Sequence, residues 1–104
     1  MRLEHLNLPA RDPEGLARWY ADTFGMQADR HLVRAQGVLI AFQKGEQLGR
    51  AADVHIGFRL PGMAALTEWA MKLGQTPGRG AEFVSFRTTD PEGNCIELYC
   101  KPDE

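Results

Sequence analysis

Two histidines and one glutamate occur at positions from which all three could reach one metal ion. His5, His55 and Glu97 each lie in a stretch where apolar residues alternate with polar ones, which is typical of a β-strand. Two imidazoles and one carboxylate suit a divalent transition metal and leave coordination positions open for water, substrate or dioxygen. The residue types therefore indicate a site that could carry out chemistry.

The alternation predicts which side chains share a strand face. In the last stretch Glu97 shares a face with Cys95 and Tyr99, while the opposite face is apolar: Ile96, Leu98 and Cys100. The stretch around His55 alternates in the same way, with Asp53, His55, Gly57 and Arg59 on its polar face. His5 and Asn7 likewise face away from Leu6 and Leu8. We expect the apolar faces to pack on helices and the polar faces to line a hollow.

The chain reads as one unit repeated, because a shift of 50 residues superimposes its two halves. The shift lays 3–6 over 53–56 and 16–19 over 66–69, and each half has a tryptophan fourteen residues after its histidine. A helix is predicted after each opening strand. The first begins at Asp12-Pro13 and closes at Gly25, and the second runs from Met63 to Leu73 before Gly74.

Short strands complete each half. They are predicted at Met26–Arg30, Leu32–Ala35, Val38–Gln43, Phe83–Thr88 and Cys95–Lys101. The organisation we expect is a single domain, 1–104, made of two tandem modules, 1–43 and 53–104, joined by a polar linker at 44–52. The glycine-rich stretch Gly74–Ala81 looks like a loop that flanks a pocket.

A structural role for the same residues stays open at this point. The strand histidines could hydrogen-bond each other or water, and Glu97 could pair with Arg59 or Arg87 across the sheet. The third histidine, His31, has no partner in the repeat and is expected at the surface. When Gly37 is set over Gly93, Ala41 corresponds to Glu97, so the first half lacks the equivalent carboxylate.

Composition excludes several classes of partner. Twelve basic and fourteen acidic side chains are spread without blocks and give a net charge of -2, which argues against nucleic acid. The longest apolar run, 38–42, is far shorter than the roughly 20 residues of a membrane span, and 1–8 is too polar for a signal peptide. We expect a cytoplasmic protein whose Cys95 and Cys100 point to opposite faces and stay reduced.

At this stage four segments together resemble the vicinal oxygen chelate superfamily, which contains glyoxalases, bleomycin resistance proteins, fosfomycin-resistance thiol transferases and extradiol dioxygenases. The segments 3–8 and 54–58 resemble the two strands that each carry a histidine ligand. The segment 19–26 resembles the end of the first helix, and 86–99 resembles the closing hairpin. The run Asp-Pro-Glu-Gly-Asn-Cys-Ile-Glu-Leu-Tyr at 90–99 is the most specific of the four. The resemblance covers nearly the whole chain.

The resemblance implies an α+β fold of two βαβββ modules whose mixed sheets curl round a shared cavity. It implies that His5, His55 and Glu97 hold one divalent ion per site, with iron, manganese, zinc and nickel left open. It further implies a homodimer acting on a small molecule. On this basis we expect a metal-dependent enzyme that chelates vicinal oxygens, as a lyase, transferase or oxygenase. A bleomycin-resistance-like protein that sequesters an aromatic ligand or antibiotic is the alternative.

The polar strand faces also suggest residues that bind substrate. Arg59 could hold an anionic group, and Asn7, Tyr99 and Cys95 are the expected wall residues. The chain departs from particular members of the superfamily. It offers Ala41 where the methylglyoxal-detoxifying glyoxalase carries a fourth ligand, and residues 81–87 lack the histidine and tyrosine of ring-cleaving dioxygenases. Both of those activities are therefore disfavoured.

Overall fold

The computed structural model describes residues 1–46 and 54–102. By their contacts these residues form two units, one of residues 1–46 with 90–93 and one of residues 54–89 with 94–102. Residues 47–52 of the predicted linker lie outside the described residues, as do Asp53, which was predicted on the polar face of the second histidine strand, and 103 and 104.

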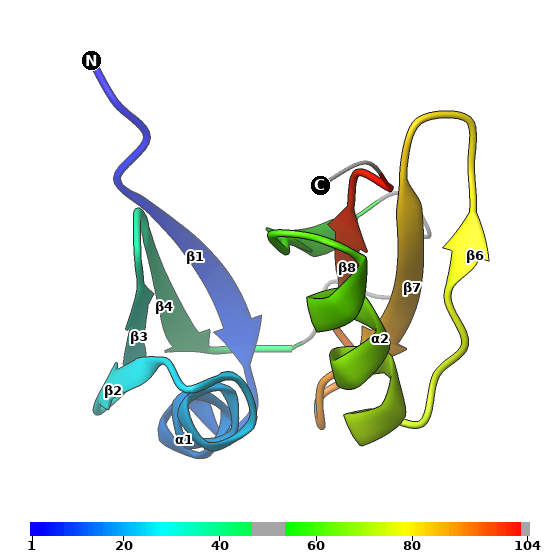
Figure 1. Ribbon diagram of the computed structural model, residues 1–104. Coiled ribbons are helices and arrows are strands. Elements are labelled where there is room, and N and C mark those ends of the chain that lie inside the picture. The colour runs from blue at the N-terminus through cyan, green and yellow to red at the C-terminus, as the bar shows by residue number, and fades with distance from the viewer. Residues whose placement is uncertain (47–53, 103–104) are drawn as a thin grey trace. The chain divides into compact units, whose positions relative to one another are not determined.

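The first unit contains one helix and a four-stranded mixed sheet in the order β1-β4-β3-β2 (Figure 1). Its elements are β1 His5–Ala10, α1 Pro13–Phe24, β2 Gln27–Asp29, β3 Leu32–Ala35 and β4 Val38–Lys44. β1 runs parallel to β4, and the other neighbours are antiparallel. The unit is therefore a βαβββ module, as predicted.

The second unit repeats this topology with the strand order β5-β8-β7-β6 (Figure 1). Its elements are β5 His55–Arg59, α2 Met63–Lys72, β6 Gly78–Arg79, β7 Val84–Thr89 and β8 Cys95–Cys100. β5 runs parallel to β8, while β6, β7 and β8 are antiparallel neighbours. The predicted fold of two βαβββ modules is confirmed.

The signals at both ends of α1 act as the sequence predicts. The Asp12 carboxylate accepts a hydrogen bond from the Gly15 amide at 3.0 Å, and Pro13 occupies the first turn. A side chain at Gly15 would collide with the Asp12 carboxylate at 2.1 Å, so glycine leaves room for the cap. Gly25 closes the helix with a φ of 72°, a left-handed conformation that glycine adopts without strain.

Each sheet buries one face against its own helix. In the first unit the Tyr20 ring stacks on Phe42 with the ring centroids 5.5 Å apart, and both side chains are buried. In the second unit Leu66 of α2 and Ile96 and Leu98 of β8 are buried. Cys95, Glu97 and Tyr99, which alternate with the buried residues of β8, are only half-buried. The predicted division of β8 into two faces is confirmed.

The turn at 90–93, between β7 and β8, belongs to the first unit. The Tyr20 hydroxyl donates a hydrogen bond of 2.7 Å to the buried Asp90 carboxylate. The Glu92 carboxylate accepts hydrogen bonds from the amides of Arg11 and Asp12 at 2.5 and 2.9 Å. Burial, and then the adjacent Asp90 charge, raise the pKa of Tyr20 well above its ordinary value. This tyrosine therefore stays protonated in the folded protein.

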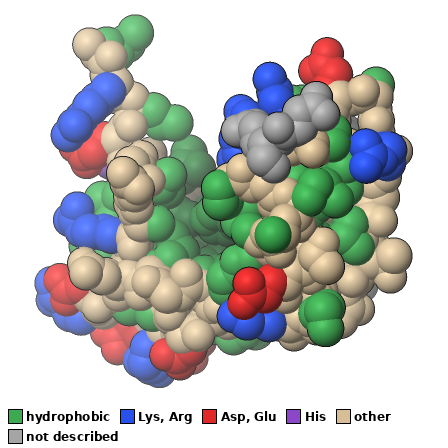
Figure 2. Space-filling model, viewed as in Figure 1, with side chains coloured by type: hydrophobic (Ala, Val, Ile, Leu, Met, Phe, Trp, Pro, Cys, Tyr) green, Lys and Arg blue, Asp and Glu red, His purple; other side chains and the backbone are tan. Residues whose placement is uncertain are grey.

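Some expectations differ in detail from the structure. β4 extends through Lys44, so the first residue of the predicted linker is a strand residue, and the short strand β6 lies within the predicted loop 74–81. Cys95 and Cys100 are both free thiols, as expected. No helix in the described part of the chain is long and apolar enough to cross a membrane. Acidic and basic side chains are interspersed on the surface near α1 (Figure 2).

Candidate functional site

A cavity of about 660 Å³ opens on the second unit. Its walls come from three strands and from the segment between β6 and β7. The lining residues are His55, Gly57, Gly80, Ala81, Glu82, Phe83, Ser85, Glu97 and Tyr99. The volume lies within the range of small-molecule sites, which are typically about 300 to 1,000 Å³. The cavity is therefore large enough to hold a small organic ligand.

His55 and Glu97 meet on the wall of this cavity. The distance between His55 Nε2 and Glu97 Oε1 is 3.5 Å, and their side chains are 29% and 23% exposed. The residue opposite Glu97 on β5 is Gly57. Because glycine has no side chain, nothing from that position blocks the carboxylate from lying beside the imidazole. The structure thus brings together two of the three predicted metal ligands.

Arg87 is the second neighbour of the Glu97 carboxylate. It lies directly opposite Glu97 in the antiparallel register of β7 and β8, and its Nε is 3.6 Å from Glu97 Oε2. This ion pair is one of the two cross-strand pairings that the sequence left open. Glu97 therefore contacts an imidazole through one oxygen and a guanidinium through the other.

His5 lies in the first unit, at the start of β1. It pairs with Leu39 in the parallel register of β1 and β4, just as His55 pairs with Cys95 in the second unit. Its side chain is 48% exposed, and its Nδ1 is 3.1 Å from the Glu4 carboxylate. Among residues 1–46 and 54–102, no three histidine, cysteine or acidic side chains are grouped closely enough to hold a metal.

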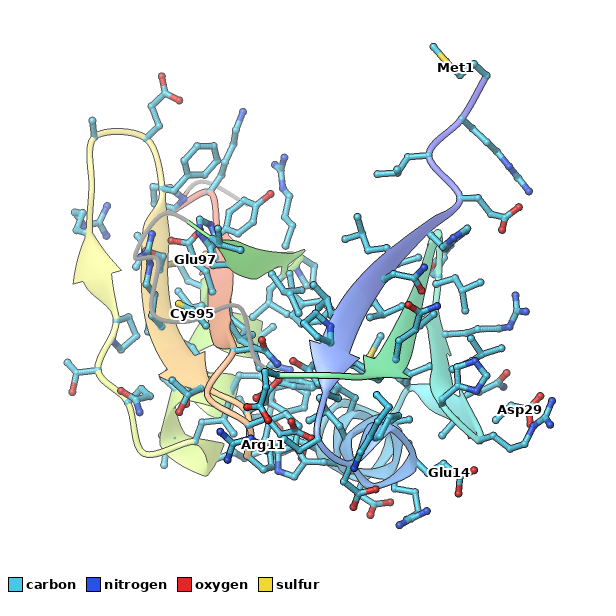
Figure 3. All side chains as sticks on the ribbon, turned by 180° about the vertical axis from the view of Figure 1, so that it is seen from behind. Met1, Arg11, Glu14, Asp29, Cys95 and Glu97 are labelled. Atoms are coloured by element: carbon cyan, nitrogen blue, oxygen red, sulfur yellow. The ribbon has the colours of Figure 1, made fainter. Side chains whose placement is uncertain are left out.

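The predicted substrate-binding residues fall in different places. Tyr99 lines the cavity, and its ring packs edge-on against Phe83 with centroids 5.3 Å apart. Cys95 and Glu97 lie along the same side of β8 (Figure 3), but within the described chain the cavity lining does not include Cys95. Arg59 is exposed on β5 beside Tyr99, and it too is outside the lining. Asn7 is exposed on β1 of the first unit.

Phe83 and Ser85 also line the cavity, although neither was among the residues predicted to do so. For Ser85 the signal was present, because Val84 and Phe86 are buried, so the alternation of β7 turns Ser85 and Arg87 to the opposite face, while Phe83 immediately precedes the strand. The stretch 74–81 was expected to flank a pocket, and two of its residues, Gly80 and Ala81, do line the cavity. The position of Ser85 in the cavity wall thus follows from the alternation of side chains along β7.

The chemistry of the paired donors suits a divalent transition metal. Imidazole nitrogen binds zinc, iron, nickel and copper well, and carboxylate oxygen accompanies it in many catalytic sites. His55 and Glu97 present one donor of each kind within 3.5 Å, on a wall that solvent can reach. These two residues fit as part of a metal site.

Comparisons with known proteins agree with the fold. A structure from Bacillus cereus, described as a possible glyoxalase, is 22% identical with a TM-score of 0.81, covering 96% of this chain and 99% of that one. Lactoylglutathione lyase from Agrobacterium tumefaciens is 17% identical with a TM-score of 0.71, covering 95% and 92%. A fosfomycin resistance protein from Mesorhizobium loti is 20% identical with a TM-score of 0.71, covering 95% and 91%. At these identities the similarity establishes the fold.

The comparison with curated proteins gives no match. The sequence profile of the glyoxalase-like domain, in contrast, matches residues 5–99, which is nearly the whole chain and includes both histidine strands and the closing hairpin. The protein therefore belongs to the glyoxalase-like domain family.

Proposed function

We propose that this protein is a divalent-metal-dependent enzyme that chelates two neighbouring oxygens of a small substrate. The observation that carries the proposal is the pair of donors on the cavity wall, with His55 Nε2 and Glu97 Oε1 3.5 Å apart. We assign His5 as the third ligand because its position in the β1 register matches that of His55 in β5. Three protein ligands leave room for a substrate to bind the same ion.

A metal in this site would act as a Lewis acid that stabilises negative charge developing on a bound oxygen. The chain's own residues would position the substrate. The rings of Phe83 and Tyr99 supply an aromatic wall, and Ser85 lies opposite Tyr99 on β7, where its hydroxyl can hydrogen-bond a substrate oxygen. These groups would hold a small, partly aromatic molecule against the donor pair.

The other residues predicted to bind substrate are Arg59, Asn7 and Cys95, and we assign them contacts with the outer parts of the substrate. Arg59 is opposite Tyr99 in the β5 and β8 register, so it can meet an anionic substituent that extends past the tyrosine. Asn7 follows His5 on the same face of β1, and Cys95 precedes Glu97 on the same face of β8. We further propose a cytoplasmic homodimer, in which His5 comes either from the same chain or from its partner copy.

The test is elemental analysis of protein purified without added metal or chelator. We expect about one equivalent of a transition metal per chain, and loss of that metal in His5→Ala, His55→Ala and Glu97→Ala. His31→Ala is the matched control, because His31 lies between β2 and β3 and should leave the metal content unchanged. Protein that is purified without metal and also resists loading would overturn the proposal, whereas metal retained in His5→Ala alone would overturn only the assignment of His5.

A second function is favoured by the aromatic wall of the cavity. Phe83 and Tyr99 meet edge-on, an arrangement that offers a ring face to a flat ligand without any need for metal. A protein that sequesters an aromatic drug would be stabilised by that drug after treatment with a chelator. Thermal denaturation with aromatic ligands, with and without chelator, separates the two functions, since the enzyme is expected to require metal for any such stabilisation.

A further inference from the structure

Glu97 lies between two side chains that approach different oxygens of its carboxylate. Its Oε1 is 3.5 Å from His55 Nε2, and its Oε2 is 3.6 Å from Arg87 Nε. The carboxylate is 23% exposed and the Arg87 side chain 49% exposed, so the ion pair is partly buried, with Glu97 in the cavity lining and Arg87 outside it. From this geometry we infer that Arg87 is a positioning residue, which holds Oε2 of Glu97 so that Oε1 alone is presented as a metal donor. This inference rests on the proposed function.

The first unit supports the inference, because its equivalent positions lack both charged groups. Glu97 pairs with Arg87 on one side and Gly57 on the other. In the first unit the corresponding row is Leu32, Ala41 and Asn7. The unit that lacks the carboxylate therefore also lacks the arginine.

The physical effect of Arg87 on a metal site has two parts. The guanidinium restricts the side-chain rotamer of Glu97, so less conformational entropy is lost when a metal binds. It also occupies one oxygen, which favours coordination through a single oxygen over coordination through both. Against this, a positive charge near the site repels a divalent ion. The inference requires the orienting effect to be the larger of the two.

The test compares Arg87→Leu and Arg87→Lys with the wild type, using Ni²⁺ and Co²⁺ as probes. Loss of an orienting partner typically lowers metal affinity by about tenfold or more. We therefore expect Arg87→Leu to bind Ni²⁺ about tenfold more weakly in a chelator-competition titration. We expect Arg87→Lys to recover part of the lost affinity because it keeps the charge. The Co²⁺ absorption spectrum of Arg87→Leu should change as Glu97 becomes free to coordinate through both oxygens.

Arg79→Leu is the matched control, because Arg79 is exposed on β6 of the same unit and lies outside the cavity lining. It should keep both the affinity and the Co²⁺ spectrum of the wild type. Arg87→Leu protein that binds Ni²⁺ as tightly as the wild type, or more tightly, or that shows an unchanged Co²⁺ spectrum, would overturn the inference while leaving the metal proposal intact. A wild type that binds neither ion would instead overturn the proposed function.

Discussion

The two βαβββ units share strand order and register but differ in the row of side chains at the centre of each sheet. In the second unit Gly57, Glu97 and Arg87 lie side by side across three strands. In the first unit Asn7, Ala41 and Leu32 occupy the same row. Ala41 is 8% exposed, whereas the Glu97 side chain is 23% exposed on the wall of a cavity. One topology thus supports a row with a buried alanine at its centre and a row with a carboxylate on a cavity wall at its centre.

The two helices also differ at one buried position. Tyr20 of α1 corresponds to Ala70 of α2 in the 50-residue repeat, and both are buried. Tyr20 fills its core by stacking on Phe42 and also reaches the Asp90 carboxylate, whereas Ala70 makes no polar contact through its methyl group. In the first unit the polar groups of Tyr20 and Asp90 therefore stabilise the core, whereas in the second unit His55 and Glu97 lie on the cavity wall.

The largest effect is expected when the carboxylate of the second unit is introduced at the equivalent position of the first unit. Ala41→Glu places a carboxylate at a buried position without a partner, which should lower the free energy of unfolding by about 3 kcal/mol or more. Chemical denaturation measures the change. Ala41→Gln has nearly the same size without the charge and should cost less. Adding Leu32→Arg to Ala41→Glu should recover part of the loss, and no recovery would argue against the register equivalence of the two rows.

Removing the Tyr20 hydroxyl should have the next largest effect. Tyr20→Phe keeps the ring stacked on Phe42 but leaves buried Asp90 without its 2.7 Å donor, at a cost of about 2 kcal/mol. The readout is the midpoint of urea unfolding. The matched control is Tyr99→Phe, since the chain has only two tyrosines and Tyr99 is half-exposed. Equal losses in the two variants would mean that the Asp90 contact contributes nothing specific.

Stability at alkaline pH should report on the same contact. The folded-state pKa of Tyr20 is raised above its ordinary value of 10.0, so the folded protein keeps this proton more tightly than the unfolded chain. The resulting stability is fully present below pH 10 and is lost as the pH rises beyond it, by about 1.4 kcal/mol per pH unit for this one group.

Unfolding curves between pH 9 and pH 11 measure this loss. Tyr20→Phe should lose less stability than the wild type over that range, while Tyr99→Phe should follow the wild type because it keeps Tyr20. A Tyr20→Phe variant with the same alkaline decline as the wild type would assign the decline to other groups.

The smallest effect is expected at Gly57. A methyl group there would lie 3.8 Å from Tyr99 Cε1, an ordinary contact, so Gly57→Ala should change stability by less than about 0.5 kcal/mol. Gly57→Asn introduces the first unit's residue into the row and should narrow the space beside Glu97. We expect it to weaken Ni²⁺ binding while Gly57→Ala does not. Identical Ni²⁺ titrations for the two variants would show that a larger side chain at position 57 does not crowd the Glu97 carboxylate.

Local signals in the sequence determined most of the fold. The cap at Asp12, the proline in the first turn and the left-handed Gly25 define the ends of α1, because each acts on backbone groups within a few residues. The period of two in β8 determined which side chains are buried, since successive residues of a strand point to opposite faces. This alternation alone was enough to predict that Glu97 lies on the face opposite Ile96 and Leu98.

Tertiary structure alone decided which partners those side chains meet. The register of β7 and β8 places Arg87, rather than another cation, against Glu97, and the register of β5 and β8 leaves Gly57 opposite it. It also decided that the turn carrying Asp90 and Glu92 bonds to α1, some 70 to 80 residues earlier in the chain. Register and such distant contacts depend on how whole elements pack, and the alternation within a single strand carries no information about its neighbour.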